Sequence, residues 1–190
     1  MPPGNNGWGM AEVSGPQWCA RFAPSKSLDD LVPDFGDRVR AFLSQLNHAG
    51  ASVSIADTYR PVERAYLMHW CCMIGSSGQD PHAIPPMPGV GIDWTHGNSL
   101  GVAKSAAQAM MSGYQIQFPA ALTSRHTQRR AIDMTISWNG TLNIRDFNGK
   151  AHAIASGPRN GSNPELIAVG ATFGVIKLVS DPPHWSDDGH

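Results

Sequence analysis

Four stretches of the chain carry apolar residues at helical spacing, and the predicted helices cover residues 34–50, 61–74, 99–111 and 163–174. Asp34 can cap the first helix and Gly50 can end it. Pro61 suits the first turn of the second, where its missing N–H has no partner to lose. Gly113 is expected to close the third helix, and Asn163 to cap the fourth.

Strand-like alternation occurs in two places, with Val53 and Ile55 on one side of 51–57 and a longer run over 131–138. In the longer run one face is apolar (Ile132, Met134, Ile136, Trp138) and the other carries Ala131, Asp133, Thr135 and Ser137. Turn signals at Asn139-Gly140 and Asn148-Gly149 predict return strands over 142–147 and 151–156, an antiparallel meander. A last strand is expected over 175–179.

This order of elements predicts an α+β fold with a mostly antiparallel central sheet flanked by helices. We expect a flexible N-terminal tail over 1–15 and one domain over 16–190. Residues 75–118 start in a segment rich in Gly, Pro and His, and we interpret them as an insertion in that domain.

Composition and charge narrow the possible partners. The formal net charge of −1 provides no basic field for a nucleic acid or an anionic membrane surface. No apolar run approaches the roughly 20 residues of a membrane span. Met1-Pro-Pro-Gly has neither the basic start nor the apolar core of a signal peptide, so we expect synthesis in the cytoplasm without one. The three cysteines are odd in number and lack CxxC spacing, which favours buried free thiols.

Two segments combine residue types that bind metals. His126 lies in the loop before the 131–138 strand, and Asp133 lies on its polar face. Zinc accepts His nitrogen and Asp oxygen, and a catalytic site has three protein ligands and an open position. In Asp181-Pro-Pro-His184-Trp the prolines hold a carboxylate and an imidazole at a set distance. Taken singly, the same residues could be an exposed pair and a proline-rich surface turn.

Tyr59-Arg60, at a strand-to-helix junction, is a third candidate, because an arginine can clamp a carboxylate or polarise a carbonyl. A surface arginine near a helix start is the alternative. The remaining histidines, His190 among them, are expected in structural or surface roles.

Together these segments resemble the family of zinc D-Ala-D-Ala carboxypeptidases/dipeptidases and phage L-alanyl-D-glutamate endopeptidases (endolysins) that cleave peptidoglycan. The family motif SxHxxGxAxD is matched by SRHTQRRAID at 124–133, and its acid-x-x-His-aromatic motif by DPPHW at 181–185. Tyr59-Arg60 completes the set, so the matches span most of the chain. The resemblance implies a hedgehog/D-Ala-D-Ala peptidase-like fold and a metallopeptidase that hydrolyses the peptidoglycan stem peptide.

Roles carry over from the resemblance position by position. His126, Asp133 and His184 would hold Zn²⁺, and Asp181 would be the general base and acid. Arg60 would act on the substrate's carbonyl or carboxylate, with Tyr59 and Ser124 as further substrate-binding residues. The aspartate at position 181 resembles the residue found there in the endolysin branch, whose members cut between L-Ala and D-Glu.

One position departs from the motif, because Arg129 stands where the family has glycine. Glycine permits a positive φ there, so the loop either bends differently or stores strain. Arg129 leaves an inactive zinc and cell-wall binding module as one alternative, and a D-Ala-D-Ala carboxypeptidase is the other. A serine or cysteine hydrolase is a third class, and it is disfavoured because Cys71-Cys72, in a predicted helix, lacks a nearby charge pattern that would activate a thiolate. The peptidase would act in the periplasm or cell wall, after release by phage lysis or export by a secretion system.

Overall fold

The computed structural model describes residues 11–190 and divides them into two compact units. Residues 11–23 and 61–122 form one, here the helical unit, and residues 24–60 and 123–190 form the other, the sheet unit. The single domain expected over 16–190 stays a prediction, and residues 75–118, the expected insertion, lie within the helical unit. Of the expected tail, residues 1–10 lie outside the described residues, whereas Glu12–Val13 forms strand β1.

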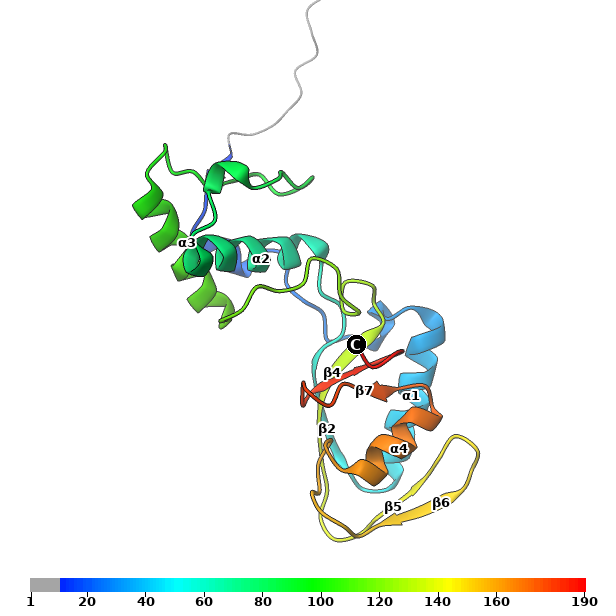
Figure 1. The fold of residues 1–190 in the computed structure, drawn as a ribbon. Coiled ribbons are helices and arrows are strands. Elements are labelled where there is room, and N and C mark those ends of the chain that lie inside the picture. Colours follow the sequence, from blue (N-terminus) through cyan, green and yellow to red (C-terminus); the bar gives the residue numbers. More distant parts are fainter. Residues whose placement is uncertain (1–10) are drawn as a thin grey trace, which may run out of the picture. The chain divides into compact units, whose positions relative to one another are not determined.

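The sheet unit contains a four-stranded antiparallel sheet in the order β2-β4-β8-β7 (Figure 1). Its strands are β2 (Ser52–Asp57), β4 (Ala131–Ser137), β7 (Ile176–Lys177) and β8 (His184–Ser186), and its helices are η2 (Leu28–Asp30), α1 (Pro33–His48) and α4 (Pro164–Thr172). This confirms the α+β class and the mostly antiparallel sheet.

One face of this sheet is core and the other is open. Ile132, Met134 and Ile136 of β4 are buried with the apolar residues of α1 and α4, in a cluster that also contains Trp185. Thr135 and Ser137 are exposed on the opposite face, and Asp133 is partly exposed there. The alternation predicted from the sequence is therefore confirmed, and Asp133 belongs to the open face.

Strands β5 (Leu142–Arg145) and β6 (Ala151–Ile154) form a separate two-stranded hairpin (Figure 1). The Asn148-Gly149 turn is confirmed, with Gly149 at φ 82°. The predicted meander is wrong, because β4 does not pair with β5. Beyond β4 the Trp138 N–H donates to the Arg159 carbonyl at 3.4 Å, so a later segment occupies that place.

Two predictions about helix ends, the Asp34 cap and the Gly113 stop, are wrong, and one is confirmed. Helix α1 begins at Pro33, and the Asp34 side chain lies in the first turn without capping it. Gly50 follows the helix at φ 81°, as expected of a terminating glycine. Gly113 lies inside α3 (Leu100–Tyr114) and does not end it. A Cβ at Gly113 would lie 2.7 Å from the Cys19 sulfur, so this glycine serves close packing.

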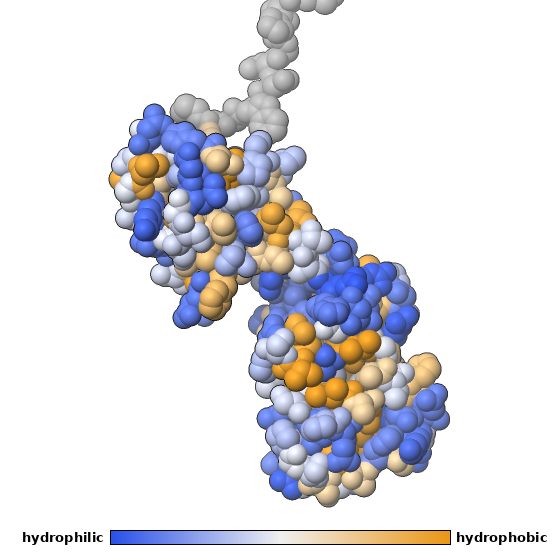
Figure 2. Space-filling model, viewed as in Figure 1, coloured by the Kyte–Doolittle hydropathy of each residue, from blue (hydrophilic) through white to orange (hydrophobic). Residues whose placement is uncertain are grey.

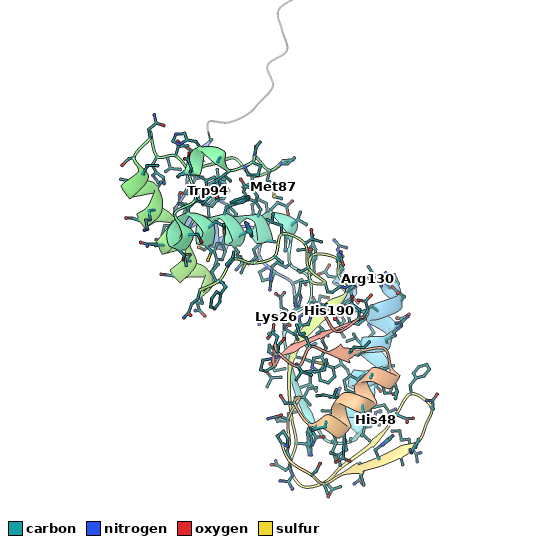
Figure 3. The ribbon with its side chains drawn as sticks, in the orientation of Figure 1. Lys26, His48, Met87, Trp94, Arg130 and His190 are labelled. Carbon is teal, nitrogen blue, oxygen red and sulfur yellow. The ribbon has the colours of Figure 1, made fainter. Side chains whose placement is uncertain are left out.

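The helical unit has its own apolar core, built mainly from α2 (Val62–Ser77) and α3. Its smaller elements are η1 (Pro16–Ala20), η3 (Pro81–Ala83) and the parallel pair of β1 with β3 (Ile92–Asp93). Trp94, labelled in Figure 3, is one of its buried residues.

The three cysteines lie in the helical unit and are free, as predicted. Cys71 and Cys72 are buried, whereas Cys19 is partly exposed. Burial raises the pKa of the Cys71 thiol to about 12, which keeps it protonated and unreactive. Within residues 11–190 no helix is both long and apolar enough to span a bilayer. Figure 2 shows hydrophobic and hydrophilic residues intermixed on the visible surface of each unit.

Candidate metal centre

The sheet register brings two of the three expected ligands together. Asp133 in β4 and His184 at the start of β8 are direct cross-strand partners, so their side chains share one face. His126 comes from the loop before β4, where its backbone carbonyl accepts the Arg129 N–H at 3.2 Å and the Arg60 N–H at 3.3 Å. These bonds fix the loop against the end of β2.

The three side chains converge on a single point. His126 Nε2 lies 3.1 Å from Asp133 Oδ1 and 3.1 Å from His184 Nδ1, and His184 Nδ1 lies 3.2 Å from Asp133 Oδ1. Zinc with ligand bonds of 2.0–2.1 Å in a tetrahedron separates its ligand atoms by about 3.3 Å. The triangle formed by these three atoms therefore has the size that a zinc ion needs.

The outer nitrogens of both imidazoles determine where the inner lone pairs point. His126 Nδ1 lies 3.2 Å from the Thr58 carbonyl oxygen, and His184 Nε2 lies 3.1 Å from the backbone oxygen of His190. A carbonyl oxygen only accepts hydrogen bonds, so each outer nitrogen carries a proton. When the rings are neutral, as metal binding requires, each inner nitrogen would present its lone pair to an ion between the three side chains, which is the usual second-shell arrangement of a metal-binding histidine.

His190 therefore contributes to the site through its backbone, although only a structural or surface role was expected of it. The main chain around it is held in place by Ser186, whose hydroxyl oxygen accepts the N–H groups of Gly189 and His190. Arg130 and His190 lie at the same end of the sheet in Figure 3.

The charges at the centre favour a cation. Burial would raise the pKa of Asp133, but hydrogen bonds and charge from His126 and His184 outweigh it and hold this pKa well below its usual range. Burial disfavours the charged form of His184, yet the hydrogen bond and charge of Asp133 prevail and raise its pKa. Both shifts have the same cause, because an ionised carboxylate and a positive charge beside it stabilise each other.

A second carboxylate, Asp57, lies on the same face of the sheet as Asp133 and was not predicted from the sequence. A β-bulge between Ile55 and Asp57 pairs Asp57 with Asp133, although simple alternation would place it beside Val53 and Ile55. Asp57 Oδ2 accepts a hydrogen bond from Arg60 Nη2 at 3.2 Å, and its buried Oδ1 has no partner within residues 11–190. Burial raises the pKa of Asp57, against the opposing charges of His126 and Arg60.

The segment that carries Asp181 and His184 is stabilised by another residue that sequence reasoning missed. Lys177 is buried, and its Nζ donates to the carbonyl oxygens of Leu178, Asp181 and His184 at 3.2, 2.7 and 3.0 Å. Burial lowers the pKa of this lysine, with Asp181 and Asp133 acting in the opposite direction. The Asp181 side chain is exposed and is not among the converging ligands.

The remaining predicted residues surround the His126 loop. Ser124 lies in the turn before His126, where its carbonyl oxygen accepts the Thr127 hydroxyl at 2.9 Å. The Tyr59 ring lies beneath the Arg129 guanidinium, 4.4 Å from its carbon. In these contacts Ser124 and Tyr59 shape the loop that carries His126.

Arg129 adopts a positive φ, a backbone conformation that glycine accommodates more readily. Its φ is 61°, in the left-handed region that L-residues occupy at a cost of about 1–2 kcal/mol. Its carbonyl accepts the Val32 N–H at 3.0 Å, and its side chain stacks on Tyr59. The loop thus keeps its shape, and of the two outcomes considered for Arg129 the structure shows the strained one.

We expect Arg129→Gly to be more stable than Arg129→Ala by about 1 kcal/mol, because both lose the stacking on Tyr59 and only glycine relieves the positive φ. Urea unfolding of the two variants at neutral pH measures the difference. At an ordinary loop position the alanine variant would be at least as stable as the glycine variant. That result would show that the strain is absent.

Comparisons with known proteins do not supply an identity for this site. No protein-family model matches the chain, and no curated protein matches it either. The geometry of the site shows a group of His126, Asp133 and His184 that could bind a metal ion.

Proposed function

We propose that this chain is a zinc-dependent peptidoglycan peptidase that hydrolyses a stem-peptide bond, as an endopeptidase of the L-Ala–D-Glu type. The observation that carries the proposal is the convergence of two imidazole nitrogens and a carboxylate oxygen within 3.2 Å of one another. Three protein ligands on an open sheet face match a catalytic zinc site, since structural sites are closed by four. The motif resemblance adds the substrate class and a hedgehog/D-Ala-D-Ala peptidase-like fold.

In this proposal His126, Asp133 and His184 hold the zinc. When bound, zinc would act as a Lewis acid and make a water molecule acidic near neutral pH. The exposed carboxylate of Asp181 accepts the proton of the attacking water and returns it to the leaving amine. Arg60 stabilises the negative charge that develops on the peptide carbonyl oxygen, and the Asp57 carboxylate orients Arg60.

The stem peptide of bacterial peptidoglycan is the proposed partner, reached after phage lysis or through a secretion system. Aspartate at position 181 favours the endopeptidase over a D-Ala-D-Ala carboxypeptidase. Arg129 is the residue that favours an inactive binding module, and its glycine-like φ of 61° supports the active peptidase instead.

The test measures amines released from purified Gram-negative sacculi, with and without a chelator and added zinc. We expect cleavage that the chelator stops and zinc restores. Mass analysis of the fragments should show a free carboxylate on L-Ala and a free amine on D-Glu. One zinc bound per chain without any released amine would instead establish the binding module. Failure to bind zinc at all would rule out both.

A further inference from the structure

A groove of about 290 Å³ opens in the sheet unit beside β4, where the ladder is interrupted. Its lining comes from three segments: Met134, Thr135 and Ile136 of β4, Asn160, Gly161 and Ser162 of the loop before α4, and Pro182 and Pro183 before β8. At one end β4 pairs with Pro183, and at the other Ser137 forms a bridge with Asn160.

Backbone groups of β4 face this groove without ladder partners. The Met134 N–H donates to the Pro183 carbonyl at 2.9 Å, but Pro183 has no N–H to donate back to the Met134 carbonyl. The N–H of Ile136 points to the same side as that of Met134, since alternate residues of a strand face the same neighbour. In the loop that lines the groove, no described residue accepts from the Ile136 N–H.

The groove opens on the face of the metal centre. The side chains of Met134 and Ile136 are buried in the core, so only the face that carries Asp133 and Thr135 is accessible. Thr135, which lines the groove, follows Asp133 by two residues on the same face of β4, a step of about 7 Å along a strand. Pro182 and Pro183, which form one wall, are also the two residues that separate Asp181 from His184.

We propose that this groove binds the main chain of an extended peptide substrate, which pairs with the open Met134 carbonyl and Ile136 N–H while the scissile bond lies at the metal centre. The inference rests on the proposed function and specifies its substrate class: a peptide that extends beyond a dipeptide. The rim residues Thr135, Asn160 and Ser162 are polar and uncharged, as suits neutral backbone amides.

Two variants block the groove from opposite walls, Thr135→Phe in β4 and Ser162→Phe in the loop, and Ser137→Phe is the control at the next exposed position of β4. We expect both blocking variants to lower kcat/KM at least tenfold on the stem tetrapeptide L-Ala–D-Glu–diaminopimelate–D-Ala. Cleavage of the dipeptide L-Ala–D-Glu and zinc affinity should stay at the wild-type level, as should the tetrapeptide rate of Ser137→Phe. Wild-type tetrapeptide rates in both blocking variants would overturn the inference.

A binding measurement separates this inference from the proposed function. If the wild-type chain binds zinc but hydrolyses neither peptide, the proposed function fails, and the tetrapeptide is titrated into the zinc-loaded chain. Amide shifts at Met134, Ile136 and Gly161, lost in Thr135→Phe, would still support the groove as a peptide site. A titration without shifts at these amides would refute it.

Discussion

Asp181→Asn is expected to lower hydrolysis of sacculi by about a thousandfold or more while the chain still binds one zinc ion. Asparagine has the shape of aspartate but cannot accept the proton of the attacking water. Zinc binding should persist because the converging ligands are His126, Asp133 and His184, and the Asp181 side chain is exposed outside that group. Amine release and zinc content, measured on the same preparation, test both statements.

The backbone of Asp181 makes this substitution informative, because the turn is held by main-chain groups. The Asp181 carbonyl accepts from Lys177 Nζ at 2.7 Å and from the His184 N–H at 3.0 Å, and its own N–H donates to Leu178 at 3.2 Å. All three bonds survive a side-chain change.

Two further variants serve as the positive and the negative control for loss of zinc and turnover. His184→Ala should lose both zinc and turnover, since it removes a ligand, and Asp37→Asn, an exposed carboxylate of α1, should lose neither. If Asp181→Asn kept more than a tenth of the wild-type rate, the proton transfer would have to be assigned to another group, with Asp57 as the next candidate.

The candidate ligand set was predicted from the motif resemblance, and local patterns indicated where two of its members, Asp133 and His184, would lie. The alternation from Ala131 to Trp138 places Asp133 on the polar face of a strand, and the structure finds it there, partly exposed. Two prolines between Asp181 and His184 indicate a stiff connection, and the turn they form leads directly into β8. Periodicity and proline content are properties of a few neighbouring residues, so the sequence alone reveals them.

Asp57 and Lys177 could not be found in this way, because their roles depend on neighbours that the sequence does not place. Asp57 reaches the metal face only through the β-bulge after Ile55, which reverses the side that alternation predicts. Lys177 gains its role from a turn that folds back over its Nζ.

The meander failed for a related reason, and the division into two compact units could not be anticipated either. Asn139-Gly140 has the composition of a hairpin turn, yet tertiary pairing of β4 with β8 and with Asn160 overrides it. The helical unit joins residues 11–23 to 61–122, and no local signal connects segments so far apart in the chain.

Lys177→Met is expected to destabilise the sheet unit by about 3 kcal/mol and to weaken zinc binding by about ten- to hundredfold. Methionine fills much of the same volume and preserves contact with the Trp185 ring, which lies 5.4 Å from Nζ. It cannot donate hydrogen bonds, so the carbonyls of Leu178, Asp181 and His184 lose a charged donor in a buried place. A buried carbonyl without a partner costs about 1–3 kcal/mol.

The measurement should follow the sheet unit specifically, because tryptophans lie in both units. Hydrogen exchange of the 176–186 amides in the zinc-free chain reports its stability, and competition with a chromophoric chelator gives the zinc affinity. Lys150→Met, at an exposed position, is the matched control. If Lys177→Met exchanged its amides at the wild-type rate, the three hydrogen bonds would contribute nothing to holding the turn. If stability fell but zinc affinity did not, the ligand geometry at His184 would be set by β8 and the His190 contact alone, independently of the lysine.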